Sequence, residues 1–210
     1  LLARRGFHVV GADFSETALA LAAETLGRED LQDRITLRRE DLLRLSFPSG
    51  TFRYAVCWGV LMHVPDLNSA LREMARVLEP GGRLVVSEGN VRSLQSVLMR
   101  TAKRVLRRRR GNVTRVAAGL ETVEETAQGV LLTRQTDFRW FAVACAEYGL
   151  TLEARFAGQF TELYALAPSA LLRRVVHAFN RFWFLHIGWA APAFGNILVL
   201  RKAQAPGGDA

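Results

Sequence analysis

The sequence predicts an α/β fold with a doubly wound, mostly parallel sheet. Short apolar strands alternate with amphipathic helices through the first ninety residues, and parallel strands covered by helices on both faces produce this order. The 210 residues are 50% hydrophobic and 23% charged. This balance is typical of a globular domain and excludes an intrinsically disordered chain. The length is that of one domain with elaborations, so a core of ordinary size can be buried.

The first half of the chain contains the regular alternation. Residues 1–5 are predicted to end a helix, and a turn at Gly6 leads into a strand that ends at Asp13. Ser15 can cap the following helix. A turn at residues 48–50 introduces a later strand. The expected strands are residues 7–13, 35–37, 52–59 and 83–88, and the expected helices are residues 16–26 and 71–78, the second terminated by Pro80, Gly81 and Gly82.

The second half is less regular and predicts two insertions. Residues 91–135 begin with a basic amphipathic helix, and residues 168–192 contain a helix rich in Phe and Trp. We expect both insertions to be helical and to serve as a lid or as membrane-facing helices. Helix, strand and closing strand are expected at residues 136–149, 150–156 and 196–202, and residues 203–210 are expected to form a flexible tail.

The positive charge is concentrated in one segment. The chain has 28 Lys+Arg against 20 Asp+Glu, a net charge of +8, and residues 91–120 hold nine basic residues and no acidic one. Apolar stripes beside these cations suit a membrane surface, whereas a plain lid would leave the charges solvated. Nucleic-acid binding is disfavoured because no known module is visible and aromatic residues do not alternate with the arginines.

Compartment signals are sparse. Residues 182–200 have no formal charge and are long enough for a membrane span, but Gly188, Pro192 and Gly195 interrupt them and predict no span. Cys57 and Cys145 lie far apart and offer neither a disulfide framework nor metal-ligand spacing, so no metal site is expected. Without a visible secretory signal, the sequence predicts a cytoplasmic protein, with peripheral membrane contact as one alternative.

Acidic residues follow two neighbouring strands. Asp13 ends the first strand just before the Ser15 cap, and Asp41 follows the next strand. In nucleotide-binding α/β folds an acid at this edge of the sheet accepts hydrogen bonds from ribose hydroxyls. A purely structural role, in which Asp13 and Ser15 satisfy helix N-terminal amides, stays open.

Together these features resemble the class I S-adenosylmethionine-dependent methyltransferases that act on small molecules. The resemblance is strong over residues 1–88, including the helix and Pro-Gly-Gly turn at residues 71–82, and fainter over residues 136–202. It implies a Rossmann-like fold that binds S-adenosylmethionine and releases S-adenosylhomocysteine. It assigns the ribose to Asp13 with Phe14 and Ser15 beside it, the adenine to Asp41 and Leu42, and the methionine side to Cys57, Trp58 and Gly59.

One part of that family's pattern is not visible in the sequence. The first strand and its glycine-rich turn are expected to precede the helix that ends at Arg5, about twenty to thirty residues upstream. We therefore expect residues 1–202 to be a single methyltransferase-like domain without its first strand and glycine-rich loop.

The resemblance implies methyl transfer to a small, apolar acceptor. His63 is a candidate base, with a place in the pocket wall as the alternative. Glu88 is expected to be a solvated strand-end acid, with a place facing the acceptor as the alternative. Asp66 is expected to be a helix cap and Cys57 a small buried residue. Two other functions stay open: a dinucleotide-binding dehydrogenase domain, and a non-catalytic module that is membrane-peripheral or nucleotide-binding.

Overall fold

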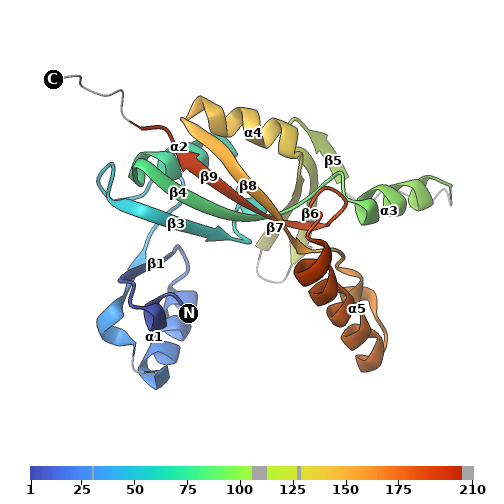
Figure 1. Cartoon of the computed structure of the whole chain (residues 1–210), viewed down its shortest axis with the longest axis horizontal. Coiled ribbons are helices and arrows are strands. Elements are labelled where there is room, and N and C mark those ends of the chain that lie inside the picture. The colour runs from blue at the N-terminus through green and yellow to red at the C-terminus, as the bar shows by residue number, and fades with distance from the viewer. Residues whose placement is uncertain (30, 106–112, 127–128, 205–210) are drawn as a thin grey trace. The chain divides into compact units, whose positions relative to one another are not determined.

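The computed structural model describes residues 1–29, 31–105, 113–126 and 129–204 (Figure 1). The chain divides into two compact units, a first unit of Leu1–Pro48 and a second unit of Ser49–Ala210. The sequence predicted one domain over residues 1–202. The division follows from the strand pairing, because the two strands of the first unit pair only with each other among the described strands.

The first unit is a strand-helix-strand motif. Strands β1 and β2 are parallel, with Val9 opposite Ile35 and Asp13 opposite Arg39. Both strands therefore bring their carboxyl ends to the same edge, which is the edge where α/β proteins bind ligands. The elements are η1 Ala3–Arg5, β1 Val9–Asp13, α1 Glu16–Glu29, η2 Gln32–Arg34 and β2 Ile35–Arg39.

The second unit is built on a four-stranded sheet in the order β3-β4-β9-β8. The α/β class is as predicted, whereas the strand directions are mixed: β3 and β4 are parallel, and β9 is antiparallel to both β4 and β8. The strands are β3 Phe52–Trp58, β4 Leu78–Gly89, β8 Leu150–Gln159 and β9 Gly195–Lys202.

One face of this sheet forms the main core. Leu84 and Val86 on β4 and Leu198 on β9 are at most 1% exposed, because alternate residues of a strand point to the same face. Helices α2 Leu67–Val77 and α4 Phe138–Glu147 belong to this unit. Asp66 caps α2 as predicted, since its Oδ1 accepts a hydrogen bond from the Ser69 amide at 3.0 Å.

Strand β3 is at the edge of this sheet. It pairs with β4 on one side and with no other described strand. Tyr54, Val56 and Trp58 alternate along it on the face opposite the core, and each is at least half exposed. The sequence predicted helices over both faces of the sheet, whereas this face of β3 is exposed among the described residues of the second unit.

The first insertion differs from the prediction. Helix α3, Leu94–Val105, begins it as expected, but three antiparallel strands follow in the order β5-β6-β7 instead of further helices. They are β5 Val113–Val116, β6 Gly119–Thr126 and β7 Gly129–Thr136. Many of their residues are Val or Thr, which favour strands. The basic run at residues 107–110 lies outside the described residues.

The second insertion is helical. It comprises the short η4 Leu163–Leu166, helix α5 Ala170–Phe182 and the π-helical turn η5 Trp183–Ile187. Ser169 caps α5, because its Oγ accepts a hydrogen bond from the Leu172 amide at 3.2 Å. Figure 1 shows α5 extending away from the four-stranded sheet. Within the described part of the chain, no helix is long and apolar enough to cross a membrane.

Candidate functional site

The carboxyl end of β1 holds the first predicted site residues. Asp13 Oδ1 accepts a hydrogen bond from the Ser15 amide at 2.8 Å, and Ser15 Oγ accepts one from the Ala18 amide at 3.3 Å. These bonds form the helix start that the sequence predicted. The first bond occupies one oxygen of the exposed Asp13 carboxylate. The second oxygen can therefore accept hydrogen bonds from a ligand.

The end of β2 brings a second carboxylate to the same edge. Asp41 Oδ1 accepts a hydrogen bond from the Leu43 amide at 2.9 Å, and the Glu40 amide donates to the Asp13 carbonyl oxygen at 3.0 Å. An open hollow is lined by Phe14, Arg39, Glu40 and Asp41. The structure therefore gathers the ribose-side and adenine-side candidates within the first unit.

Glu40 was not identified from the sequence. It is 9% exposed, and its Oε2 accepts a hydrogen bond from the Ser46 amide at 2.8 Å while Oε1 accepts one from the Ser46 hydroxyl. These bonds fold residues 41–46 into a fixed loop. Glu40 thus holds the backbone on which Asp41 and the half-buried Leu42 lie.

The residues of this hollow suit a nucleoside. The carboxyl oxygens of Asp13 and Asp41 can accept hydrogen bonds from ribose hydroxyls and from an exocyclic amine. Phe14 is 77% exposed beside them, and an exposed aromatic ring offers a flat apolar surface to a base. The donor and acceptor chemistry therefore fits the nucleoside part of S-adenosylmethionine.

The carboxyl end of β3 holds the residues predicted for the methionine side. Cys57 is 7% exposed, and burial together with the negative charge of Glu88 raises the pKa of its thiol to about 12. The thiol therefore stays protonated near neutral pH, which argues against a nucleophilic cysteine. Trp58 is 59% exposed, and Gly59 has a φ of 67°, a conformation that favours glycine.

His63 ends the short helix η3, Leu61–His63, just after this strand. Its Nδ1 lies 2.6 Å from the Leu132 carbonyl oxygen on β7. A carbonyl oxygen can only accept, so in the neutral ring Nδ1 carries the proton and Nε2 keeps a lone pair. His63 is exposed, and a neutral ring held through Nδ1 leaves Nε2 with the chemistry of a base.

Arg134 on β7 fastens this loop to the inserted sheet. The guanidinium donates to the carbonyl oxygens of Leu61 at 3.2 Å, Val64 at 2.9 Å and Pro65 at 3.4 Å. It also pairs with Glu121 on β6 at 2.6 Å, and Arg134 is only 2% exposed. Nothing in the sequence marked this residue among 26 arginines.

Glu88 is buried, so the expectation of a solvated acid is wrong. It is 2% exposed at the end of β4, where Oε2 accepts a hydrogen bond from the Thr136 hydroxyl at 3.0 Å and Oε1 has no partner among the described residues. Burial raises the pKa of this carboxyl to about 7, although the Thr136 bond and the charge of Arg134 oppose the rise. Strand alternation was the missed signal, because Glu88 follows Leu84 and Val86 on the buried face.

The candidate residues thus fall into two groups, one in each unit. The first unit holds Asp13, Phe14, Ser15, Asp41 and Leu42, and the second unit holds Cys57, Trp58, Gly59 and His63. Within each group the residues lie at the carboxyl ends of parallel strands, as predicted for a ligand-binding edge.

Sequence comparison links the first part of the chain to methyltransferases. Residues 1–86 match the family model described as a methyltransferase domain. Methyltransferase GfsG of Streptomyces halstedii is 37% identical over 92 residues, which are 43% of this chain and 33% of that protein. Demethylmenaquinone methyltransferase of Lactiplantibacillus plantarum is 40% identical over 80 residues, 38% of this chain and 34% of that protein. The matches therefore span about a third of the length of these curated relatives.

Solved structures align with nearly the whole length of this chain. An S-adenosylmethionine-dependent methyltransferase from Methanosarcina mazei aligns with a TM-score of 0.65 at 16% identity, over 97% of this chain and 86% of that one. Geranyl diphosphate C-methyltransferase from Streptomyces coelicolor, solved with Mg²⁺, geranyl diphosphate and S-adenosylhomocysteine, aligns with a TM-score of 0.58 at 18% identity, over 96% and 64%. At these identities the likeness shows the fold alone, and it confirms the predicted Rossmann-like α/β class.

Proposed function

We propose that this chain, whose residues 1–86 match the methyltransferase-domain family model, transfers a methyl group from S-adenosylmethionine to a small, apolar acceptor. The observation that carries the proposal is the acidic edge of the first unit. There Asp13 ends β1, and Asp41 and the exposed Phe14 line one hollow beside it. Relatives named as methyltransferases, 37% and 40% identical over the matching segment, support the same chemistry.

S-adenosylmethionine supplies a methyl group already activated by its sulfonium charge. In the proposal Asp13 and Asp41 of the first unit hold its ribose and adenine. Because the methyl is activated, the protein's part is mainly to align the acceptor and exclude water, and alignment alone can supply effective molarities of about 10⁵ M or more.

His63 is proposed as the group that takes a proton from the acceptor. The Leu132 carbonyl oxygen fixes the ring through Nδ1, which leaves Nε2 as the basic nitrogen. Arg134 holds the backbone on both sides of His63, so the ring sits on a fixed loop. A fixed base of this kind suits an acceptor that carries an acidic hydroxyl.

The apolar acceptor is proposed to be lipid-like and to be met at a membrane surface. A relative that is 40% identical over the matching segment is named for demethylmenaquinone, a lipid-like molecule. In this chain, α5 and η5 expose large apolar side chains such as Leu171 and Leu185, which suits contact with such molecules or with the bilayer that contains them.

Calorimetric titration of S-adenosylhomocysteine into the protein at its native length tests the cofactor part of the proposal. We expect micromolar binding that Asp13→Ala weakens by about tenfold or more, since hydrogen bonds to a charged group are lost. Asp33→Ala is the matched control, because Asp33 lies in η2 before the amino end of β2, and its binding should equal that of the wild type.

Three results would count against the proposal. A folded protein that does not bind S-adenosylhomocysteine would exclude the cofactor. Equal weakening by Asp33→Ala would exclude a specific role for Asp13. Tighter binding of NADH than of S-adenosylhomocysteine would instead indicate a dinucleotide-binding domain, which also uses a strand-end acid for its ribose.

A further inference from the structure

Helix α5, the turn η5 and Trp189, two residues after that turn, carry exposed apolar side chains. Leu171 is 72% exposed, Val175 56%, Phe182 52%, Leu185 57% and Trp189 64%. We call these five residues the α5 apolar face. Large side chains exposed together in this way mark an interaction surface, because scattered single apolar residues are normal and a group of them is not.

The α5 apolar face is not the side of the helix that packs on the rest of its unit. That side is marked by Asn180, which is 8% exposed. The Asn180 side chain accepts hydrogen bonds from the Phe160 and Thr161 amides at 3.0 Å and donates to the Thr161 carbonyl oxygen at 2.8 Å. The ring of Trp183 also packs on that of Phe160, with centroids 4.2 Å apart.

Helix geometry separates the two sides. Leu171, Val175 and Phe182 are spaced by four and seven residues, so they share one stripe along α5. Asn180 lies five residues after Val175. At about 100° per residue, this spacing turns the Asn180 side chain away from that stripe. The buried polar contacts of Asn180 therefore fix the helix while the apolar stripe stays exposed.

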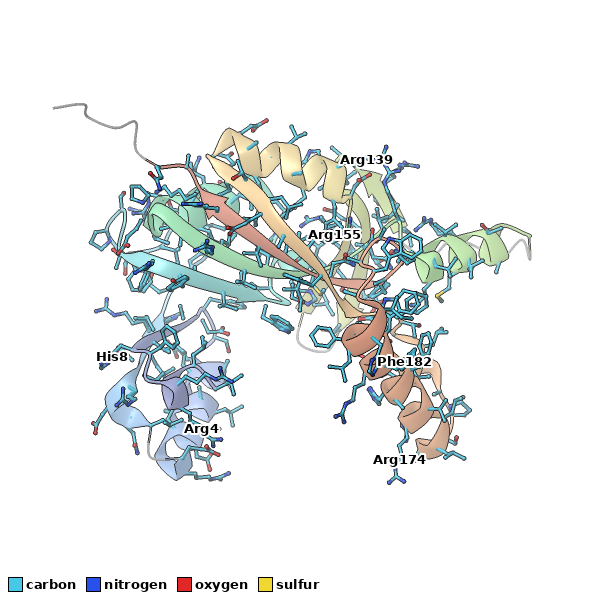
Figure 2. All side chains as sticks on the ribbon, viewed as in Figure 1. Arg4, His8, Arg139, Arg155, Arg174 and Phe182 are labelled. Carbon is cyan, nitrogen blue, oxygen red and sulfur yellow. The ribbon has the colours of Figure 1, made fainter. Side chains whose placement is uncertain are left out.

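The charge around this face is of one sign. Residues 163–204 include no Asp or Glu, whereas α5 carries Arg173, Arg174 and Arg181. The three arginines are exposed, and Figure 2 shows Arg174 and Phe182 toward opposite ends of α5, with the Arg174 side chain extending outward. Arg174 and Arg181 therefore lie beside the apolar stripe on one side of the helix, whereas Arg173 lies toward the Asn180 side and donates to the Ala167 carbonyl oxygen at 3.3 Å.

We infer that the α5 apolar face and these arginines bind the surface of an anionic lipid bilayer. An apolar stripe with arginines beside it inserts into the interface while the guanidinium groups reach the phosphates. Trp189 suits the interface at which the stripe inserts, because tryptophan prefers the boundary between headgroups and acyl chains. A second copy fits less well, since a symmetric pair would place two arginine-rich faces against each other. This surface is the part of the chain that would make the proposed peripheral membrane contact. Lipid binding there does not depend on methyl transfer.

Vesicle co-sedimentation of the full chain tests the inference. With vesicles of phosphatidylcholine containing about 30% phosphatidylglycerol we expect the protein to pellet, and with phosphatidylcholine alone we expect at least tenfold weaker partitioning. Val175→Asp/Phe182→Asp should reduce partitioning to the anionic vesicles at least tenfold. Val143→Asp/Leu21→Asp is the matched control, because both residues are more than 60% exposed and lie on other helices, and it should bind as the wild type does.

A second measurement separates insertion from simple charge attraction. Brominated lipids quench tryptophan only at close range, so we expect quenching on binding and a clear reduction in Trp189→Phe. Circular dichroism of each variant confirms that it is folded. Wild-type protein that stays in the supernatant, equal binding of the two double variants, or dimerisation that Val175→Asp/Phe182→Asp abolishes would each overturn the inference.

Discussion

Replacing Arg134 with alanine is expected to lower the free energy of unfolding of the second unit by about 3–5 kcal/mol. The guanidinium is 2% exposed, and it satisfies three carbonyl oxygens and the Glu121 carboxylate. Alanine removes all five of these hydrogen bonds and leaves Glu121, whose side chain is 20% exposed, without its cation. Breaking one half of a buried ion pair costs far more than the net contribution of the pair itself.

Urea denaturation followed by tryptophan fluorescence measures this loss. All four tryptophans lie in the second unit, so the signal reports on that unit. Arg83→Ala is the matched control, because its ion pair with Glu153 is exposed, and it should leave the midpoint nearly unchanged. Equal urea midpoints for the two variants would show that the buried Arg134 contacts stabilise the second unit no more than the exposed Arg83 pair does.

Glu88→Gln is expected to stabilise the second unit at pH 8 and not at pH 4. The pKa of Glu88 rises from 4.5 to about 7 on folding, so between these values the folded state holds a proton that the unfolded state has released. The stabilisation that this proton provides is complete below about pH 4.5 and is lost as pH rises through about 7. At pH 8 the charged carboxylate therefore costs about 2–3 kcal/mol, which a neutral side chain avoids.

Thermal unfolding of wild type, Glu88→Gln and Glu147→Gln at several pH values checks this expectation. Glu147 is exposed at the end of α4 and serves as the control for the loss of one carboxyl group. The stability of wild type should fall between pH 5 and pH 8 relative to that of Glu88→Gln. A constant difference across this range would contradict a raised pKa for Glu88.

The sequence was most informative where local chemistry determines structure. Strand alternation and capping residues predicted β1 with Asp13, the Ser15 turn and the Asp66 cap, because each depends on a few neighbouring residues. The same local signals placed Asp13 and Asp41 at one sheet edge. The parallel pair β3 and β4 was also predictable, since a helix separates the strands, although the Pro-Gly-Gly segment expected before the second strand lies within β4.

Features that depend on distant parts of the chain were not predicted. The three-stranded inserted sheet follows helix α3, and Gly119 at the turn between β5 and β6 has a φ of 145°. Arg134 finds its partners about seventy residues earlier in the chain, and Glu88 finds Thr136 forty-eight residues later. These long-range contacts decide which charged side chains are buried, and single-residue patterns do not show them.

The edge strand β3 has a consequence for how the chain assembles. Its backbone N–H and C=O groups on one side meet no described strand, and Tyr54, Val56 and Trp58 expose apolar surface along it. An edge of this kind is a template for strand addition, because it offers both hydrogen bonds and apolar contacts to another extended segment. During refolding at high protein concentration, intermolecular pairing at β3 should therefore compete with folding. We expect the yield of native protein to rise as the chain is diluted and after Val56→Lys, which places a charge on that edge.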